Sequence, residues 1–358
     1  MKFLTIIGAR PQFIKAAPLS KELRRRHREV LVHTGQHYDY GMSEQFFREM
    51  GIPRPDHNLE VGSGSHGAQT AAMLARLEPV VLQERPEAVI IFGDTNSTLA
   101  GALTAAKLHI PLAHIEAGMR SFNRRMPEEV NRVVADHLAD IHLCSTRTAI
   151  ENLRREGITR GLCLVGDIMH DALKQLLPPP PKVKQMVQKL SLPDRGYLFV
   201  TIHRAENTDH PANLSGIVRA LLLSNRPVVF PVHPRTAARL KQTPLWDKLR
   251  KSQQVRLIAP QGYAESLALQ SRALAVITDS GGIQKEAYLL KTPCLTARSE
   301  TEWVETVKAG WNQLVGADPR AILAALEKLR HPASHPALYG RGDAARRIVQ
   351  QLEKQLVR

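Results

Sequence analysis

The stretch LAVITDSGGIQKEAYLL, residues 274–290, joins a strand pattern to a helix pattern through a very short turn. Its apolar run ends at Asp279, and Ser280 and two glycines lead directly into the helical pattern. Strands that pass into helices in this way are the repeating unit of α/β folds. Two interpretations of the bare backbone at Gly281 and Gly282 stay open. It is a tight turn and nothing more, or it is a place where an anion rests on the N–H groups at the start of the helix.

The same alternation of apolar runs and helical patterns extends over the whole chain. The first half contains FLTIIG (3–8), EVLVHTG (29–35), AVIIFGD (88–94), IPLAHIEAG (110–118), DIHLCST (140–146) and GLCLVGD (161–167). The second half contains YLFVTIHR (197–204), RPVVFPVHP (226–234), VRLIAP (255–260), LAVITDSGG (274–282) and TPCLTARS (292–299). Strands this apolar, separated by helices, indicate parallel sheets that are covered on both faces. We therefore predict an α/β protein built from doubly wound, Rossmann-like sheets.

The chain is long enough for two domains, and PPPP at 178–181 interrupts the alternation. We predict an N-terminal Rossmann-like domain over 1–167, a linker over 168–195 and a C-terminal Rossmann-like domain over 196–341. The amphipathic pattern AARRIVQQLEKQL within 342–358 predicts a helix that packs back on the first domain. Two such domains are expected to face each other across a cleft, lined by the carboxyl ends of both sheets, where ligands of this architecture bind.

Composition narrows the classes of partner. The net charge of +15 suits nucleic acid, a membrane surface or an anionic small substrate. Aromatic residues are only 5% of the chain and do not alternate with basic ones, so nucleic acid is not expected. Cys144, Cys163 and Cys294 lie far apart in the chain and form no CxxC pair. We expect them to be buried, reduced cysteines of a cytosolic protein. There is no signal-peptide pattern and no apolar stretch of membrane-spanning length, so we expect a cytoplasmic protein without a membrane partner.

Polar residues gather where the apolar runs end. Candidates in the first half are Arg10, Lys15, Asp94, Glu116, Glu128 and Arg132, and those in the second half are His203, Arg204, Asn207, His233, Ser280 and Glu286. Taken singly, each has a structural interpretation: Asp94 caps a helix, Glu128 and Arg132 form an i,i+4 pair, and His203 is a core histidine. Taken together they predict a site, because the carboxyl ends of parallel strands meet at one edge of a sheet.

Two other patterns are not expected to bind anything. GSGSHG (62–67) matches a dinucleotide-binding motif by letter, but only a short apolar run precedes it and no strand ending in an acid follows at the right distance. His33 and His37 lie four residues apart, but Gly35 argues against a helix that would present both to a metal. We predict no metal site.

The order of the motifs resembles the non-hydrolysing UDP-N-acetylglucosamine 2-epimerases. The matching motifs are GARPQFIK, GQHYD, GDTNSTLA, HIEAGMRS, PEEVNR, HRAEN, PVHPR, DSGGIQKEA and AGWNQLVG, which cover nearly the whole chain. The resemblance implies a GT-B-type fold, a homodimer and no cofactor. It also implies reversible inversion of C-2, from UDP-N-acetylglucosamine to UDP-N-acetylmannosamine, for surface polysaccharide precursors.

The chemistry that the resemblance implies is demanding. The C-2 proton lies next to no carbonyl, so its direct removal is very slow. If the bond to UDP breaks first, the sugar becomes cationic and the C-2 proton becomes acidic. Elimination then gives a glycal and UDP, and re-addition with a proton on the other face gives the epimer. The reaction needs carboxylates for proton transfer, and cations and N–H groups for the departing pyrophosphate.

The resemblance also implies roles for individual residues. Asp94, Glu116 and Glu128 match the catalytic acids, and His203 matches a catalytic histidine near the pyrophosphate. Ser280, Gly281 and Gly282 match the phosphate cradle, and Glu286 matches the carboxylate that receives the ribose hydroxyls. The remaining predicted substrate-binding residues are Arg10, Lys15, Arg132, Arg204, Asn207, His233, Gln261, Tyr263 and Trp303, with APQGY (259–263) at the uracil.

The sequence departs from the family pattern in three places. TEWVE (301–305) has Trp303 where an arginine is common, and RPQFIK replaces R-P-E-x-I-K. Both variants resemble the subgroup that acts on UDP-2,3-diacetamido-2,3-dideoxyglucuronate, whose carboxylate would need a cation such as Arg204 or Arg298. A neutral exchange within the family is the other interpretation. Asp39 stands where a glutamine often helps bind a second UDP-N-acetylglucosamine, although Gln36 and His37 match. Allosteric activation is therefore not expected.

Three other functions stay open. A GT-B glycosyltransferase would pass the sugar to an acceptor, but the acids Asp94, Glu116 and Glu128 exceed what such a transfer needs. A nucleotide-sugar sensor would bind without turnover. A hydrolysing epimerase would release UDP and free N-acetylmannosamine, which an assay for UDP release separates from the first prediction.

Overall fold

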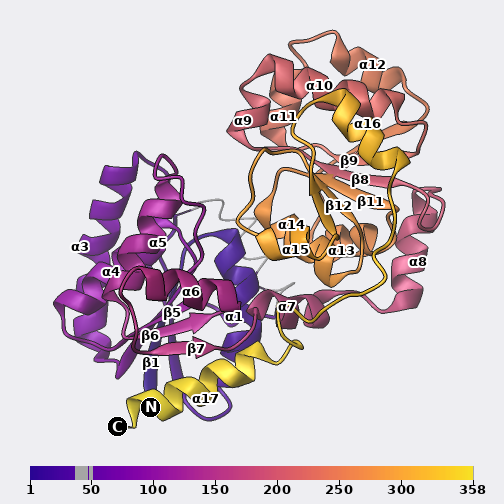
Figure 1. Ribbon diagram of the computed structural model, residues 1–358. Coiled ribbons are helices and arrows are strands. Elements are labelled where there is room, and N and C mark those ends of the chain that lie inside the picture. The colour runs from indigo at the N-terminus through magenta and orange to yellow at the C-terminus, as the bar shows by residue number, and fades with distance from the viewer. Residues whose placement is uncertain (37–46, 48–50, 358) are drawn as a thin grey trace. The chain divides into compact units, whose positions relative to one another are not determined.

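The computed structural model describes residues 1–36, 47 and 51–357, and these form two compact units (Figure 1). Unit 1 comprises Met1–Gln175 with Ala337–Arg358, and unit 2 comprises Leu176–Pro336. Each unit contains one fully parallel sheet with helices on both faces. The predicted class, a pair of doubly wound α/β sheets, is confirmed.

The sheet of unit 1 has the order β3-β2-β1-β4-β5-β6-β7. Its strands are β1 (Lys2–Ile7), β2 (Arg28–His33), β3 (His57–Asn58), β4 (Ala88–Phe92), β5 (Leu112–Ala117), β6 (Ile141–Cys144) and β7 (Leu162–Leu164). The strand order reverses between β1 and β4, and in open α/β sheets this switch point is where ligands bind. The edge strand β3 was not predicted, because its two polar residues carry no apolar pattern.

The helices of unit 1 enclose this sheet. They are α1 (Arg10–Leu23), α3 (His66–Glu84), α4 (Asn96–Lys107), α5 (Pro127–Leu138), α6 (Arg147–Arg155), α7 (Ile168–Leu176, whose last residue belongs to unit 2) and α17 (Ala344–Leu356). The C-terminal helix α17 packs on α1 and β6. Its first two N–H groups donate to the carboxylate of Asp171 at 3.0 and 3.1 Å, which holds the start of the helix against α7.

The sheet of unit 2 has the order β10-β9-β8-β11-β12-β13, with the reversal between β8 and β11. Its strands are β8 (Leu198–Thr201), β9 (Val228–Pro231), β10 (Val255–Ile258), β11 (Ala275–Thr278), β12 (Cys294–Thr296) and β13 (Asn312–Leu314). Its helices are α8 (Pro180–Lys189), α9 (Ala205–Thr208), α10 (Pro211–Leu223), α11 (Pro234–Leu240), α12 (Leu245–Lys251), α13 (Tyr263–Ser271), α14 (Gly281–Leu289), α15 (Val304–Lys308) and α16 (Pro319–Glu327).

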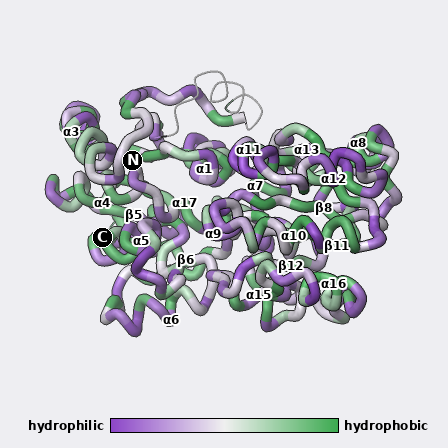
Figure 2. The backbone as a smooth tube through the Cα atoms, turned by 90° about the horizontal axis from the view of Figure 1, so that it is seen from above, coloured by the Kyte–Doolittle hydropathy of each residue, from purple (hydrophilic) through white to green (hydrophobic). Residues whose placement is uncertain are grey.

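Side chains of this sheet alternate between two apolar cores. Leu198 and Val200 of β8 lie in the core covered by α10 and α16, whereas Tyr197 and Phe199 lie in the core covered by α13 and α14. Because both faces are covered, β8 and β11 run as hydrophobic stretches of the chain (Figure 2). No helix within the described part of the chain is both long and apolar enough to cross a membrane.

Candidate active site

The turn after β1 carries two of the predicted cations. Arg10 opens α1 and is exposed, whereas Lys15 is buried and its ammonium pairs with the carboxylate of Glu116. Gln12 fixes the turn: its carbonyl oxygen accepts from the N–H groups of Gly8 and Ala9, at 2.8 and 3.1 Å, and its amide donates to the carbonyl of Phe92 at 2.9 Å. A glutamate at this position could not donate that last bond when ionised, so the glutamine of RPQFIK joins the end of β1 to the end of β4.

Glu116 lies in an irregular part of β5. The pairing of β5 with β6 shifts register between Ile115 and Ala117, and Glu116 between them has a φ of 70°. A non-glycine residue in this region is uncommon, and such strain concentrates at functional sites. A β-bulge of this kind redirects a side chain. The result here is that the Glu116 carboxylate, with Lys15, lies against Gly93: both charged groups are 3.3 Å from the position that a Cβ on Gly93 would occupy.

Asp94 follows β4 and is held by an arginine. The guanidinium of Arg132 on α5 lies 2.5 Å from its carboxylate, and Asn131 donates to its backbone carbonyl at 2.9 Å. The capping of α4 falls to Thr95, whose hydroxyl accepts from the N–H of Thr98. The alternative in which Asp94 only caps α4 is therefore wrong, because its carboxylate forms an ion pair with Arg132.

Glu128 and Glu129 begin α5 but face different surroundings. Glu128 is exposed, whereas Glu129 is buried and accepts from the N–H groups of Ser121 and Phe122, both at 2.9 Å. Arg132 pairs with Glu129 at 2.9 Å, so the i,i+4 pair of Glu128 with Arg132 does not form. Burial alone would raise the pKa of Glu129, but these donors outweigh it and lower the pKa. Glu129 was not among the predicted site residues, although its i,i+3 spacing to Arg132 is a signal for such a pair.

In unit 2 a buried carboxylate organises the segment after β8. Asp279 is fully buried and accepts from the N–H groups of His203 and Arg204, at 3.1 and 3.0 Å, and from the Asn207 amide at 3.0 Å. The Asn207 amide also donates to the carbonyl of Ala297 at 2.9 Å. Asp279, at the end of the apolar run of β11, thus fixes the backbone of two predicted site residues and the side chain of a third. Asp279 itself was not among the predicted residues.

His203 and His233 lie together at the ends of β8 and β9. Their ring centroids are 5.6 Å apart, and the Nδ1 atom of His203 is 3.5 Å from Asp279. Burial lowers the pKa of both imidazoles, and Asp279 only partly offsets this for His203. Both rings are therefore neutral near pH 7. The His203 side chain is 39% exposed, so it is not the core histidine of the structural interpretation.

The start of α14 is open on one side only. Ser280 is the N-cap residue, and its side chain makes no capping hydrogen bond. A Cβ on Gly281 would lie 2.3 Å from the Glu302 carboxylate, whereas a Cβ on Gly282 would meet nothing nearer than the Ser280 hydroxyl at 3.9 Å. The backbone at Gly282 is therefore accessible at the positive end of the helix, which is the geometry that anions use.

Three further predicted residues of unit 2 lie on α14, at the start of α13 and in the loop before α13. Glu286, on α14, is buried and accepts from the Gln270 amide at 2.8 Å. Tyr263 is buried at the start of α13, and the Gln261 amide bonds to the carbonyl of Ala259 at 2.7 Å.

Trp303 is buried beneath a lysine. The ammonium of Lys285 lies 4.1 Å from the centre of the Trp303 ring, a cation–π contact. Arg298, which the sequence analysis took as a spare cation, is buried between Glu302 at 2.9 Å and Glu206 at 3.1 Å. Arg204 lies 4.0 Å from Glu302 and is 31% exposed. Of the two arginines, Arg204 is thus the one with an accessible guanidinium.

The two sequence patterns set aside earlier have structural roles where they are described. Ser65 of GSGSHG caps α3 by accepting from Ala68, and His33 stacks on Phe13. His37 and Asp39 lie outside the described residues. Gln36 accepts from the Ser97 hydroxyl at 2.7 Å. Among the residues with described positions, no group of three or more His, Cys, Asp or Glu side chains could hold a metal ion.

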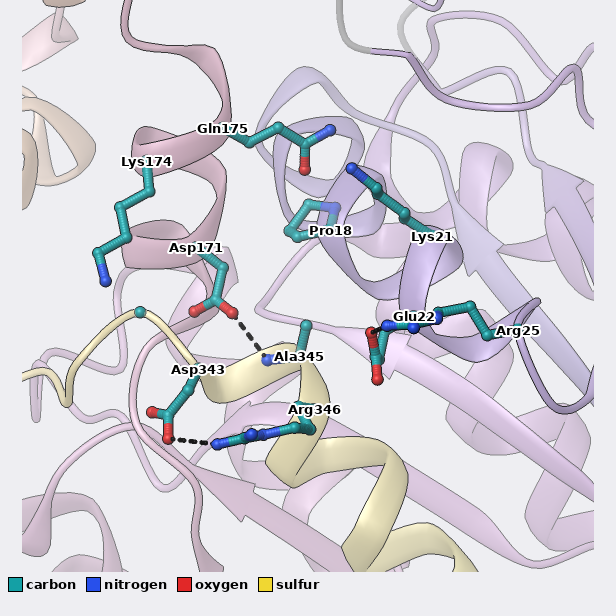
Figure 3. A pocket seen from close by; sticks show the side chains of 11 residues that line it. Pro18, Lys21, Glu22, Arg25, Asp171, Lys174, Gln175, Asp343, Ala345 and Arg346 are labelled. Carbon is teal, nitrogen blue, oxygen red and sulfur yellow. Dashed lines mark hydrogen bonds and ion pairs between the residues drawn. The ribbon is translucent and has the colours of Figure 1, made fainter.

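A cavity of about 700 Å³ in unit 1 contains none of the predicted site residues. It lies between α1, α7 and α17 (Figure 3), and its charged lining residues are Lys21, Glu22, Arg25, Asp171, Lys174, Asp343 and Arg346. Several of these neutralise one another, as Asp343 and Arg346 do at 3.5 Å, or hold the start of α17, as Asp171 does. The cavity is a mixed-charge junction of three helices and is separate from the acids at the ends of β4 and β5.

Known proteins resemble this chain over its whole length. The sequence model of the UDP-N-acetylglucosamine 2-epimerase family matches residues 21–353. A UDP-N-acetylglucosamine 2-epimerase homolog of Methanococcus maripaludis is 49% identical over 98% of this chain and 99% of its own. The UDP-2,3-diacetamido-2,3-dideoxy-D-glucuronate 2-epimerase of Pseudomonas aeruginosa is 47% identical over 99% of this chain and all of its own.

A solved structure gives the same result. The UDP-GlcNAc 2-epimerase of Methanocaldococcus jannaschii, in complex with UDP-GlcNAc and UDP, superimposes with a TM-score of 0.89 at 40% identity, over 99% of this chain and all of that one. The expected GT-B-type fold is confirmed by this likeness. With matches of this extent in sequence and in structure, the chain belongs to the UDP-N-acetylglucosamine 2-epimerase family.

Proposed function

We propose that this protein interconverts UDP-N-acetylglucosamine and UDP-N-acetylmannosamine by eliminating UDP to a glycal and adding it back. One observation carries the proposal: Asp94 and Glu116, at the ends of neighbouring strands β4 and β5, are each paired with a cation, Arg132 and Lys15 respectively. Carboxylates at the ends of neighbouring strands are what proton transfer at C-2 and the stabilisation of a cationic sugar require.

We propose complementary roles for unit 2. The start of α14, at Ser280, Gly281 and Gly282, receives the pyrophosphate, since its backbone is accessible there and carries the positive end of the helix dipole. His203, neutral near pH 7 because burial lowers its pKa, donates one hydrogen bond to the phosphate. As negative charge develops on UDP, that charge raises the pKa of His203 and favours its protonated form. Glu286 receives the ribose hydroxyls. The other proposed binding residues are Arg10, Arg204, Asn207, His233, Gln261, Tyr263 and Trp303, and Glu128 is kept as a third catalytic acid.

Solvent exchange tests the proposal directly. Incubation with UDP-N-acetylglucosamine in deuterated water should place deuterium at C-2 in both epimers, followed by proton NMR. Asp94→Asn should slow this exchange by about 10²- to 10⁴-fold, the usual contribution of one proton-transfer group. The absence of deuterium with this substrate and with the diacetamido uronate would refute an epimerase. UDP release that depends on an added acceptor would indicate a glycosyltransferase instead.

The same chemistry on UDP-2,3-diacetamido-2,3-dideoxyglucuronate is the second candidate. The observation that supports it is the 47% identity to the Pseudomonas aeruginosa enzyme, which is nearly the 49% identity to the Methanococcus maripaludis UDP-N-acetylglucosamine 2-epimerase homolog. Arg204 is the accessible cation for a uronate carboxylate. Arg204→Gln should then raise KM for the uronate by a larger factor than KM for UDP-N-acetylglucosamine, because only the uronate carries the additional carboxylate. If kcat/KM of the wild-type protein is higher for the uronate, this candidate replaces the first.

We also propose that the protein works as a cytoplasmic homodimer that supplies precursors of surface polysaccharides. Support for the dimer and for the pathway comes from the family resemblance. Sedimentation velocity should give a species of twice the 39.9 kDa chain mass. A single species at the mass of one chain, under assay conditions, would exclude the dimer.

A further inference from the structure

A buried ion network in unit 1 contacts residues that flank Asp94 and Glu116 in the sequence. It has no role in the function proposed above. At its centre is Asp136 on α5, which is 1% exposed. One carboxylate oxygen lies 2.7 Å from the Nδ1 atom of His114. The other accepts from the N–H of Gly118 at 3.1 Å and from the guanidinium of Arg120 at 2.7 Å. One side chain thus binds three points on or just after β5.

The first arm of the network leads to Asp94. The Nε2 atom of His114 lies 2.8 Å from the carbonyl oxygen of Gly93, the residue before Asp94. The two ring nitrogens of this fully buried histidine thus lie against the Asp136 carboxylate on one side and the Gly93 carbonyl on the other. The imidazole therefore acts as a rigid spacer between Asp136 and the peptide that leads into Asp94.

The second arm leads to Glu116. Gly118 and Arg120 follow the bulge at Glu116 by two and four residues. The Arg120 guanidinium also donates to the carbonyl of Met119 at 2.7 Å and, through two further nitrogens, to both oxygens of Glu156 at 2.7 Å. Gly118 packs closely against α6, because a Cβ there would lie 2.3 Å from the carbonyl oxygen of Ala149. The backbone after Glu116 is therefore fixed by the same carboxylate as the backbone before Asp94.

We infer that Asp136 is a positioning residue for the epimerisation, which holds the carboxylates of Asp94 and Glu116 at a fixed spacing through His114 and the Gly118–Arg120 segment. This inference rests on the proposed function. The physical reason is that proton transfer requires donor and acceptor within hydrogen-bonding reach, and a misplacement of 1 Å costs about 10²-fold in rate. Burial by itself would raise the pKa of Asp136, but His114 and Arg120 outweigh it and keep the carboxylate ionised.

The test uses Asp136→Asn in the full chain. The variant keeps the size of the side chain and one oxygen acceptor, but it loses the charge that holds His114 and Arg120. We expect kcat for deuterium incorporation to fall about 10- to 100-fold, while KM for UDP-N-acetylglucosamine stays within twofold. KM is spared because, apart from Arg10, the residues proposed to bind the UDP-sugar belong to unit 2 and lie outside this network. A residue that only stabilises unit 1 would lower the melting temperature without this separation of kcat from KM.

Asp140→Asn is the matched control. Asp140 lies four residues further along and its carboxylate accepts from the N–H of Leu112 at 2.8 Å, at the opposite end of β5 from Glu116. Its replacement should leave kcat unchanged. His114→Gln tests the route: if Asp136 acts partly through His114, the double variant should be no slower than Asp136→Asn alone. Losses that multiply in the double variant would show that the two residues act independently.

Two outcomes overturn the inference: a kcat of Asp136→Asn within twofold of wild type, or an equal loss in Asp140→Asn. If wild-type protein exchanges no C-2 proton with either UDP-sugar, it is the proposed function that fails. Amide hydrogen exchange then decides the positioning without any substrate. Peptides over 92–96 and 115–121 should exchange faster in Asp136→Asn than in Asp140→Asn, and equal rates would refute it.

Discussion

Glu128 and Glu129 are neighbours in the chain, but their different surroundings predict a catalytic role for Glu128 and a stabilising role for Glu129. Glu128 is exposed and is proposed to be catalytic, whereas Glu129 is buried among Ser121, Phe122 and Arg132. Glu128→Gln should lower kcat by about 10²-fold or more and leave the melting temperature unchanged. Glu129→Gln should lower the free energy of unfolding by about 2 kcal/mol, since it weakens buried hydrogen bonds to a charged group.

Thermal melts and the C-2 exchange rate, measured on both variants, check this pair. A Glu128→Gln protein with wild-type kcat would remove Glu128 from the catalytic set. In that case Glu129 would be the residue through which α5 acts, by holding Arg132 against Asp94.

His142 makes the stability of unit 1 depend on pH. It is 2% exposed, its Nε2 atom donates to the carbonyl of Asp136 at 2.8 Å, and its Nδ1 atom has no hydrogen-bond partner among the described residues. Burial lowers its pKa from the ordinary value of 6.5. Below pH 6.5 the unfolded chain therefore binds a proton that the folded protein does not, so stability falls as the pH falls toward the folded pKa.

The loss attributable to His142 is about 1.4 kcal/mol for each unit by which its pKa is lowered. His142→Gln keeps the donor to Asp136 and removes the titration, so its melting temperature should fall less than that of wild type between pH 6.5 and 5. The exposed His137 supplies the control, since His137→Gln should leave the pH dependence unchanged. An identical decline in His142→Gln and in wild type would assign the effect to other groups.

At the scale of elements, the opening of α14 distinguishes a turn from an anion site. A Cβ on Gly282 meets open space, so Gly282→Ala should not lower the melting temperature. If the pyrophosphate rests there, the added methyl should weaken UDP binding about tenfold, or by about 1.4 kcal/mol. Gly281→Ala should instead destabilise unit 2 by about 1–3 kcal/mol, because its Cβ would overlap the Glu302 carboxylate, which is buried and held by Arg298 at 2.9 Å. Calorimetric titration with UDP and thermal melts measure both effects. If Gly282→Ala binds UDP as tightly as wild type does, the anion site is refuted and the two glycines serve only to form a tight turn.

Strand β5 shows what the sequence could predict and what it could not. The apolar run IPLAHIEAG predicted the strand and put Glu116 near its end, which is correct. The bulge and the φ of 70° at Glu116 were not predictable, because they depend on partners far away in the chain. Lys15 comes from α1 and Asp136 from α5, and no local pattern in β5 encodes either contact.

Glu129 and Asp279 were not predicted as site residues for a similar reason: their contacts come from other parts of the chain. Glu129 had the pattern of an acid that suits a helix start, and Asp279 that of the last residue of a strand. Only the tertiary fold brings Ser121 to Glu129 and His203 to Asp279. Strand β13 was missed for a different reason: its three residues, Asn312–Leu314, are too short and too polar for an apolar pattern.

At the scale of the whole molecule, the net charge of +15 bears on how an anionic substrate arrives. The chain carries 49 Lys and Arg residues against 34 Asp and Glu residues. Many of the cations near the proposed site are already neutralised, as Lys15 is by Glu116 and Arg298 is by Glu302. Apart from Arg10 and Arg204, which are proposed to bind the substrate, the surplus cations are spread along the chain and contribute a general positive field. Such a field raises association rates and is screened by salt.

The charge therefore predicts a specific dependence on ionic strength. Raising the salt concentration from about 20 to 500 mM shortens the screening length from roughly 20 Å to about 4 Å, so kcat/KM for the UDP-sugar should fall several-fold. Because saturating substrate removes the association step from the rate, kcat should change little. Uridine is the matched neutral ligand, and its dissociation constant should be independent of salt while that of UDP rises. An equal response of uridine and UDP would mean that salt acts on the protein itself, and the surplus charge would then have no part in capturing the substrate.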